Sequence, residues 1–248
     1  MQRDCERFMR TERKCILREH AGDSDRPMHC VTKIEPIVNG RGRARVYLDE
    51  TFAFVLYKAE LREFAITEGA ELHDAAYEKI TEQVLPLRAK KRAMHLLEKR
   101  PYTEKTLRDK LSDGEYPEAC IDAAIDYVKS YGYLDDLQYA IDHISYHLAD
   151  RPRRRLEQDL LKKGIDKALL AQAFERCYEE ADLRARESGA QAQGAENARA
   201  LERNMIEKEL RKKRYDPEQA DYETRAKLTA SLIRKGFDAE FVREVLGS

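Results

Sequence analysis

The chain has 248 residues and is highly charged. Charged residues make up 38% and hydrophobic residues 42%, with 11 glycines, 7 prolines, no tryptophan and a formal net charge of -1. This length accommodates one or two domains with a real core, and the composition favours helices over a sheet-rich fold. The net charge points to no particular partner, so a site for a polyanion must depend on local charge.

The sequence carries no targeting or disulfide signal. The five cysteines (Cys5, Cys15, Cys30, Cys120 and Cys177) are scattered and form no CxxC pair, which argues against a disulfide framework or a zinc site. No apolar run approaches the roughly 18 to 20 residues that span a bilayer, and the N-terminus lacks the apolar core of a signal peptide. We therefore expect a reduced, cytoplasmic protein that does not bind membranes.

Residues 1–30 are charge-mixed and show no period. We expect either a disordered tail or a start-site artefact, because Met28 directly precedes a segment with regular patterning. We place no function in this tail.

Residues 31–86 predict a small α+β segment. Val, Ile, Tyr and Phe alternate with polar residues, and Asn39–Gly42 has the composition of a hairpin turn. We expect three antiparallel strands near 31–37, 43–48 and 51–57 and a short helix over about 58–64. A longer helix over 74–97 should be interrupted or kinked near Pro86, because proline removes one backbone hydrogen bond.

The rest of the chain contains one apolar pattern three times. Seven apolar residues recur at the same offsets from Leu111, Leu160 and Leu232. The first set is Leu107, Leu111, Tyr116, Cys120, Ile121, Ala124 and Ile125. The second is Leu156, Leu160, Ile165, Leu169, Leu170, Ala173 and Phe174, and the third is Leu228, Leu232, Phe237, Phe241, Val242, Val245 and Leu246. This agreement predicts a helix, a turn and a second helix in each copy.

Each copy is preceded by a further predicted helix, near 88–99, 137–149 and 197–213. The repeats are therefore assigned to 87–136, 137–180 and 181–248, and the third carries an insertion at Glu187–Ala195. We expect Gly114, Gly164 and Gly236 at the turns, where left-handed backbone favours glycine. The predicted fold is mainly α, with three tandem three-helix repeats forming a curved array after a small three-stranded antiparallel β segment with a helix.

Basic residues cluster at related places in these repeats. Asp150 is expected to cap a helix that has Pro152 in its first turn. Arg100-Pro101 and Arg151-Pro152 are expected at equivalent positions, and Lys162-Lys163 and Arg234-Lys235 both precede a turn glycine. The predicted binding residues are Lys90, Lys91, Arg92, Arg100, Arg151, Arg153, Arg154, Arg155, Lys162, Lys163, Lys212, Lys213, Arg214, Arg234 and Lys235. Such runs are often only a solvated helix face, but equivalent positions in an array predict a stripe that binds a polyanion or an acidic groove.

Other polar motifs have simple structural interpretations. Asp135 and Asp136 can cap a helix, and no further acidic residue or histidine nearby in sequence completes a Mg²⁺ site. His143 and His147 lie four apart on a predicted helix but lack a third metal ligand, so we interpret them as surface histidines. The sequence contains no GxxxxGK[ST], GxGxxG or GxSxG motif. We expect no enzymatic activity, no metal and no cofactor.

Four motifs together resemble the RecX family, bacterial regulatory proteins of the RecA recombinase, over about Val31 to Leu246. They are Ala89-Lys90-Lys91-Arg92-Ala93 with Leu96-Leu97, Tyr131-Gly132-Tyr133-Leu134-Asp135-Asp136 with Tyr139-Ala140, Arg151-Pro152-Arg153 with Lys162-Lys163-Gly164-Ile165, and Arg234-Lys235-Gly236-Phe237. The chain departs from the family at Glu115 after Gly114, at Tyr102-Thr103 and in the insertion before the third repeat.

The resemblance implies a crescent of three-helix units in the helical groove of the RecA–DNA filament. There the protein would inhibit the ATPase, strand-exchange and co-protease activities of RecA in homologous recombination, DNA repair and the SOS response. We expect a monomer whose partners are the RecA filament and single- or double-stranded DNA. A combined Arg153→Glu and Arg154→Glu variant should then weaken inhibition.

The alternatives are a standalone DNA-binding helical protein and a helical scaffold for another protein. A standalone DNA binder predicts tight binding to naked DNA with a steep salt dependence. A scaffold for another protein predicts neither RecA inhibition nor DNA binding.

Overall fold

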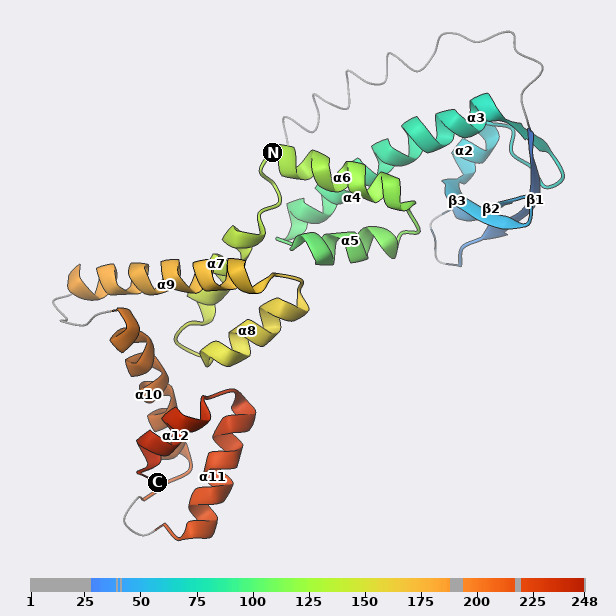
Figure 1. Cartoon of the computed structure of the whole chain (residues 1–248). Helices are drawn as coiled ribbons and strands as arrows, with labels where there is room; N and C mark the ends of the chain where they lie inside the picture. The colour runs from blue at the N-terminus through green and yellow to red at the C-terminus, as the bar shows by residue number, and fades with distance from the viewer. Residues whose placement is uncertain (1–27, 39, 41, 188–193, 217–219, 248) are drawn as a thin grey trace. The chain divides into compact units, whose positions relative to one another are not determined.

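The computed structural model describes residues 28–38, 40, 42–187, 194–216 and 220–247. The expectations for residues 1–27 and for most of the insertion at Glu187–Ala195 therefore lie outside the described residues. The chain forms two compact units, one of Met1–Pro101 with Leu107–Tyr133 and the other of Tyr102–Thr106 with Leu134–Ser248. Figure 1 labels strands β1 to β3 and the α-helices of both. Among the described residues, no helix is long and apolar enough to cross a bilayer.

A four-stranded antiparallel sheet begins the described chain. Strands β1 (Met28–Pro36), β2 (Arg43–Leu48) and β3 (Thr51–Tyr57) confirm the three predicted strands, although β1 starts within the predicted tail. A fourth strand, β4 (Glu71–His73), pairs with the start of β1 and gives the order β3-β2-β1-β4. The prediction missed β4 because three residues are too few for an alternating pattern to be recognised.

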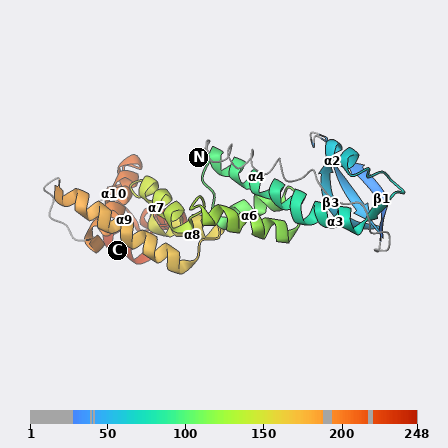
Figure 2. The same ribbon diagram turned by 90° about the horizontal axis from the view of Figure 1, so that it is seen from above.

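Helices α2 (Lys58–Glu63), α3 (Asp74–Lys79) and α4 (Leu85–Lys99) follow in the same unit. Between α3 and α4, the five residues of η2 (Ile80–Val84) form a π-helical turn, so helical backbone continues from α3 through α4 (Figure 2). A π turn changes the hydrogen-bond pattern just before Pro86, which has no N–H to donate. The irregularity predicted near Pro86 therefore takes the form of a π turn.

The first repeat consists of α4, α5 (Glu104–Ser112) and α6 (Glu118–Ser130). The second consists of α7 (Asp136–His147), α8 (Arg153–Lys162) and α9 (Lys167–Glu187). The third consists of α10 (Gly194–Lys212), α11 (Tyr222–Lys235) and α12 (Ala239–Leu246). In each copy six of the seven residues of the apolar pattern are buried, and Tyr116, Leu169 and Val245 are partly buried. The apolar pattern therefore predicted the three-helix repeats and their cores.

The turn after the second helix of each repeat places one residue in left-handed backbone. This residue is Glu115 in the first repeat (φ 60°), Gly164 in the second (φ 90°) and Gly236 in the third (φ 102°). The expectation that Gly114 takes this conformation is wrong, because Gly114 precedes the equivalent position by one residue. The departure at Glu115 is thus a shift of the glycine and leaves the length of the turn unchanged.

Gly164 and Gly236 are required by the close approach of a neighbouring helix as well as by their φ angles. A Cβ on Gly164 would lie 2.4 Å from the Cβ of Lys105, and a Cβ on Gly236 would lie 3.1 Å from the Cβ of Arg155. Lys105 and Arg155 lie in the first turns of α5 and α8. The start of each of these helices therefore packs against the turn of the following repeat.

Glu115 occupies the same turn position in the first repeat but faces the sheet. Its carboxylate lies 2.6 Å from Nη2 of Arg45 in β2 and also accepts Nε–H of Arg45 at 2.8 Å. A second ion pair joins Arg88 of α4 to Glu60 of α2 at 2.7 Å, with the Arg88 guanidinium 4.7 Å from the ring centre of Tyr57. The sheet is therefore fastened to the first repeat by two arginines.

We predict that Gly164→Ala destabilises the protein more than Gly132→Ala. Both glycines close a helix end with positive φ, 90° and 68°, so alanine costs each about 1–2 kcal/mol of left-handed strain. An added Cβ on Gly132 would meet no atom within 4 Å, whereas at Gly164 Lys105 must move. Urea denaturation followed by circular dichroism should give a loss of unfolding free energy at least about 1 kcal/mol larger for Gly164→Ala. If the two variants lost the same unfolding free energy, the close approach of Lys105 would not be a reason for glycine at position 164.

Candidate polyanion-binding groove

A groove lies between the second and third repeats, within the second compact unit. Its volume is about 420 Å³, and it is lined by Ala149, Asp150, Arg151, Pro152, Arg155, Met205, Lys208, Glu209, Lys212, Lys235 and Phe237. These residues come from the α7–α8 connection, the first turn of α8, α10, the end of α11 and the turn that follows α11. We call it the inter-repeat groove. Five cations and two carboxylates line it, so it is positively charged overall.

On the α8 side of the groove, one carboxylate holds two arginines. Oδ2 of Asp159 lies 3.2 Å from Nη1 of Arg151, and Oδ1 lies 3.5 Å from Nε of Arg155. The Asp159 side chain is 19% exposed, whereas those of Arg151 and Arg155 are 43% and 49% exposed. One negative charge cannot neutralise both arginines, so this side of the groove keeps a positive charge.

On the α10 side, Glu209 plays the same part between two lysines. It contacts Lys235 of α11 and lies 3.4 Å from Nζ of Lys212. The hydrogen bond from Lys235, followed by the charges of both lysines, lowers the pKa of Glu209, which is ionised at neutral pH. Lys208 is exposed and makes no recorded ion pair within the described part of the chain. This side therefore also carries more cations than carboxylates.

The start of α8, which borders the inter-repeat groove, is capped by a residue of the third repeat. Pro152 is the N-cap residue and offers no side-chain acceptor, so the prediction that Asp150 caps this helix is wrong. Instead, the carboxylate of Glu202 in α10 accepts the backbone N–H of Arg153 at 3.0 Å. An N-terminal N–H has no partner within its own helix, so this contact ties the two repeats together.

The start of α5 is capped in the same way. The carboxylate of Asp136, the first residue of α7, accepts the backbone N–H of Glu104 at 2.8 Å. The residue before Glu104, Thr103, is fully buried, and its hydroxyl donates to the carbonyl of Lys163 at 2.6 Å. Thr103, and not Pro101, is thus the structural equivalent of Pro152. The expected equivalence of Arg100-Pro101 with Arg151-Pro152 is therefore wrong by two residues.

Of the central arginines, Arg153 has a structural role and Arg154 does not. The guanidinium of Arg153 lies 4.7 Å from the ring centre of Phe174 and 5.9 Å from that of Tyr178, and its Nε–H donates to Glu157 at 2.8 Å. Arg154 is exposed and makes no recorded contact among the described residues. A charge reversal at Arg153 would disturb the packing of α8 on α9, so the double variant at these two positions would not test binding alone.

The lysines before the turn glycine of the second repeat face another surface. Nζ of Lys163 donates to the hydroxyl of Tyr139 at 2.6 Å and lies 4.9 Å from the centre of its ring. Lys162 is exposed, and its carbonyl accepts from Nζ of Lys105 at 3.2 Å. Neither Lys162 nor Lys163 lines the inter-repeat groove.

The basic block of the first repeat lies in the first compact unit. Lys90 of α4 is partly buried, with Nζ 5.3 Å from the ring centre of Tyr127. Lys91 and Arg92 are exposed on α4, and Arg100 is exposed at its C-cap. The predicted binding residues thus divide between the two compact units.

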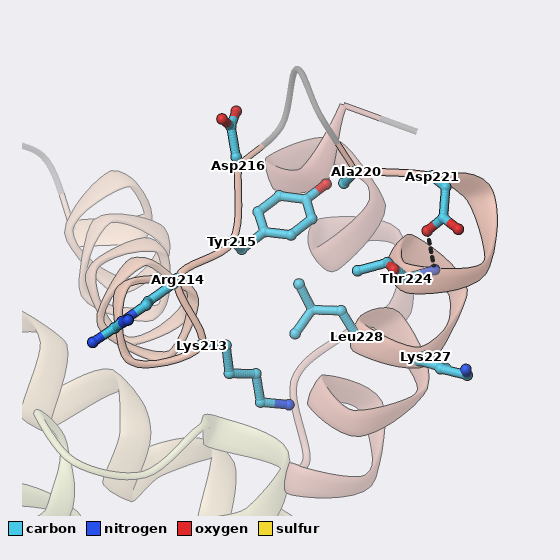
Figure 3. Close-up of a pocket in the computed structure, with 9 residues that line it drawn as sticks. All are labelled: Lys213, Arg214, Tyr215, Asp216, Ala220, Asp221, Thr224, Lys227 and Leu228. Atoms are coloured by element: carbon cyan, nitrogen blue, oxygen red, sulfur yellow. Dashed lines mark hydrogen bonds between the residues drawn. The ribbon is translucent and has the colours of Figure 1, made fainter.

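Two further predicted binding residues, Lys213 and Arg214, line a second pocket in the third repeat, and a third, Arg234, lies near the end of α11. This pocket of about 710 Å³ lies between the end of α10 and the start of α11. Figure 3 shows Lys213 extending beneath the opening and Arg214 projecting away from it. Nζ of Lys213 lies 3.0 Å from the hydroxyl of Ser231, and Nε of Arg234 donates to the carbonyl of Ala230 at 3.3 Å. Of the predicted binding residues, only Arg151, Arg155, Lys212 and Lys235 line the inter-repeat groove.

Comparison with known proteins identifies the family. The family models described as "RecX, first three-helix domain" and "RecX, third three-helix domain" match residues 89–127 and 202–246. A regulatory protein RecX from Clostridioides difficile (strain 630) is 27% identical over 224 residues, which cover 88% of this chain and 95% of the relative. The chain belongs to the RecX family. A regulatory protein RecX from Clostridium beijerinckii is 30% identical over 140 residues, which cover 56% of this chain and 66% of the relative.

The fold is also that of a RecX-family protein. A crystal structure of regulatory protein RecX matches 88% of this chain and 98% of its own, with a TM-score of 0.53 and 22% sequence identity. The three-helix repeats therefore belong to the family fold.

In this RecX-family chain the paired aspartates after Leu134 cap two different helices. Asp135 is the N-cap of α7 and accepts the N–H of Gln138 at 2.9 Å, which confirms the predicted capping role. Asp136 caps α5, as described above. Both carboxylates are therefore used by the fold.

The histidines of α7 differ from the prediction. His143 is partly buried, and burial, with smaller effects from Lys163 and His147, lowers its pKa to about 4. Its ring lies 6.3 Å from that of Tyr139 and 4.9 Å from that of His147, so it packs as a neutral aromatic ring. Among the described residues, no three histidines, cysteines or carboxylates gather as a metal site requires.

Sequence reasoning missed two residues that matter for this region. Lys208 lies four residues before Lys212, and this helical spacing could have placed both on one face of α10. Glu202 had no signal in the sequence, because its partner is a backbone N–H at Arg153, 49 residues away.

We predict that Glu202 has a stability effect that depends on pH. Burial raises the pKa of Glu202, so its contribution to stability is greatest below the pKa of an unfolded glutamate and is lost as pH rises through the folded value. Glu202→Gln cannot ionise and keeps an acceptor, so its unfolding free energy relative to the native chain should rise from about pH 4 to about pH 7. Glu202→Ala lacks both the charge and the acceptor, so its unfolding free energy should lie about 1 kcal/mol below that of Glu202→Gln at both pH values. A Glu202→Gln difference that stays constant with pH would contradict the effect of burial.

Proposed function

We propose that this protein regulates RecA by binding the RecA–DNA filament and inhibiting its ATPase, strand-exchange and co-protease activities, and so acts in DNA repair and the SOS response. The family and its relatives named regulatory protein RecX support a regulatory role. The motif resemblance supplies RecA as the partner. The inter-repeat groove carries the proposal for a contact surface, because its five cations can meet phosphates or acidic side chains of a filament.

Within the groove, Lys208 and Lys212 are the best positions for a test. Both are exposed on α10, and neither packs on an aromatic ring in the described part of the chain. Replacing Lys212 leaves Glu209 paired with Lys235, so the contact between α10 and α11 remains. Arg155 is less suitable, since its Cβ packs against Gly236.

We predict that combined Lys208→Glu and Lys212→Glu weakens inhibition of RecA. Two negative charges in place of two positive ones reverse the charge of one wall of the groove and should repel an acidic partner. In an ATPase assay of RecA on single-stranded DNA, the protein concentration for half-inhibition should rise at least about tenfold.

The control variant is combined Lys167→Glu and Arg176→Glu. These residues are exposed on α9 in the same compact unit, and neither lines the groove. The control therefore changes the net charge by as much as the groove variant does but leaves the inter-repeat groove intact. The control should inhibit as the native protein does. Equal loss of inhibition in both variants would argue that net charge, and not the groove, determines binding.

The second candidate function is standalone DNA binding, which the same cations favour. It predicts that the groove variant lowers the slope of log affinity against log salt for naked DNA by about two, one for each lost phosphate contact. It also predicts that RecA is inhibited only at protein concentrations that cover the DNA. Inhibition at substoichiometric ratios of protein to RecA supports the filament proposal.

A further inference from the structure

A cluster of tyrosines in the first compact unit is not used by the proposed function. Tyr127 lies near the end of α6, Tyr131 is its C-cap residue and Tyr133 follows in the next turn. The ring centres of Tyr127 and Tyr131 are 5.0 Å apart, and those of Tyr131 and Tyr133 are 5.9 Å apart with planes only 12° from parallel. We call these three residues the tyrosine platform. The inter-repeat groove, in contrast, belongs to the second compact unit.

The backbone holds the platform in place. Gly132 has φ 68°, its N–H donates to the carbonyl of Lys129 at 2.9 Å, and the N–H of Tyr133 donates to the carbonyl of Val128 at 3.0 Å. This pair of bonds closes the end of α6 and sets the side chains on either side of Gly132 next to one another. A partner therefore meets rings that are already ordered, which reduces the entropic cost of binding.

The platform is exposed and has one cation beside it. Tyr131 is 57% exposed, so its ring contributes little to the core of the first repeat. Nζ of Lys90 lies 5.3 Å from the ring centre of Tyr127. Asp126 and Lys129 lie about 100° and about 200° around α6 from Tyr127, so Lys90 is the charged residue placed against the platform.

We propose that the tyrosine platform stacks an unpaired base of single-stranded nucleic acid on Tyr131, with Lys90 near its phosphates. A planar base matches an exposed aromatic face, and every base has such a face, so the site would tolerate any sequence. The positive charge of Lys90 favours a phosphate chain over a neutral peptide, which could also cover an aromatic surface. This inference does not rest on the proposed function, because it concerns other residues and naked strands.

The test is fluorescence anisotropy of a labelled oligothymidylate of about 15 nucleotides, a length within the usual range of a single-strand site. Tyr131→Ala should weaken binding by about tenfold, the usual loss when a stacking ring is removed. Tyr131→Phe keeps the ring and should bind within about twofold of the native protein. Tyr222→Ala is the matched control, since Tyr222 is 88% exposed on α11 and makes no ring contact among the described residues, and it should leave affinity unchanged.

An abasic strand of the same length separates stacking from phosphate contacts. Tyr131→Ala should bind the abasic strand as the native protein does, because no base is present to stack. The proposal is overturned if Tyr131→Ala binds oligothymidylate normally, if it weakens binding to both strands equally, or if the native protein does not prefer oligothymidylate to the abasic strand. Circular dichroism of each variant confirms the fold. Since Lys208 and Lys212 are native in all these variants, failure here leaves the groove proposal standing, and the reverse also holds.

Discussion

The three repeats depend on one kind of contact, in which the start of the second helix of one repeat packs against the turn of the next repeat. At α5 it brings the side chain of Lys105 against Gly164, and at α8 it brings the Cβ and backbone of Arg155 against Gly236. At the first of these contacts the side chains of Thr103 and Lys105 also satisfy the carbonyls at the end of α8. Backbone groups at helix ends otherwise lack partners, and a cation there meets the negative end of the helix dipole.

The β segment takes the place of an earlier repeat. Within the described residues, no repeat precedes the first one to pack a helix against its turn. The left-handed position of this turn is occupied by Glu115, whose carboxylate pairs with Arg45 of the sheet. Glycine is needed where two backbones approach closely, and a charged residue is tolerated where a longer side chain bridges the gap. The sheet thus covers the end of the array through ion pairs between side chains, while the repeats join one another where a turn glycine receives the start of a helix.

The repeats were predictable because their cores depend on spacing within about 20 residues, which a sequence displays directly. The positions of single side chains were not. The left-handed residue of the first repeat depends on Arg45, 70 residues from Glu115 in the chain. Arg153 belongs to a solvated basic run by sequence, yet it stacks on Phe174, which only the packing of α8 on α9 reveals. The inter-repeat groove likewise combines residues of two repeats, so the sequence could predict only some of the residues that line it.

Carboxylates that cap a helix of the preceding repeat have a consequence for how the protein folds. The first N–H of α8 is satisfied by Glu202, and that of α5 by Asp136, so each helix is complete only when the next repeat is in place. Stabilising contacts between adjacent repeats make a linear array fold cooperatively, and they leave little stability in a repeat taken alone. Opening of the third repeat would therefore fray the start of α8, and local unfolding would travel along the chain from one repeat to the one before it.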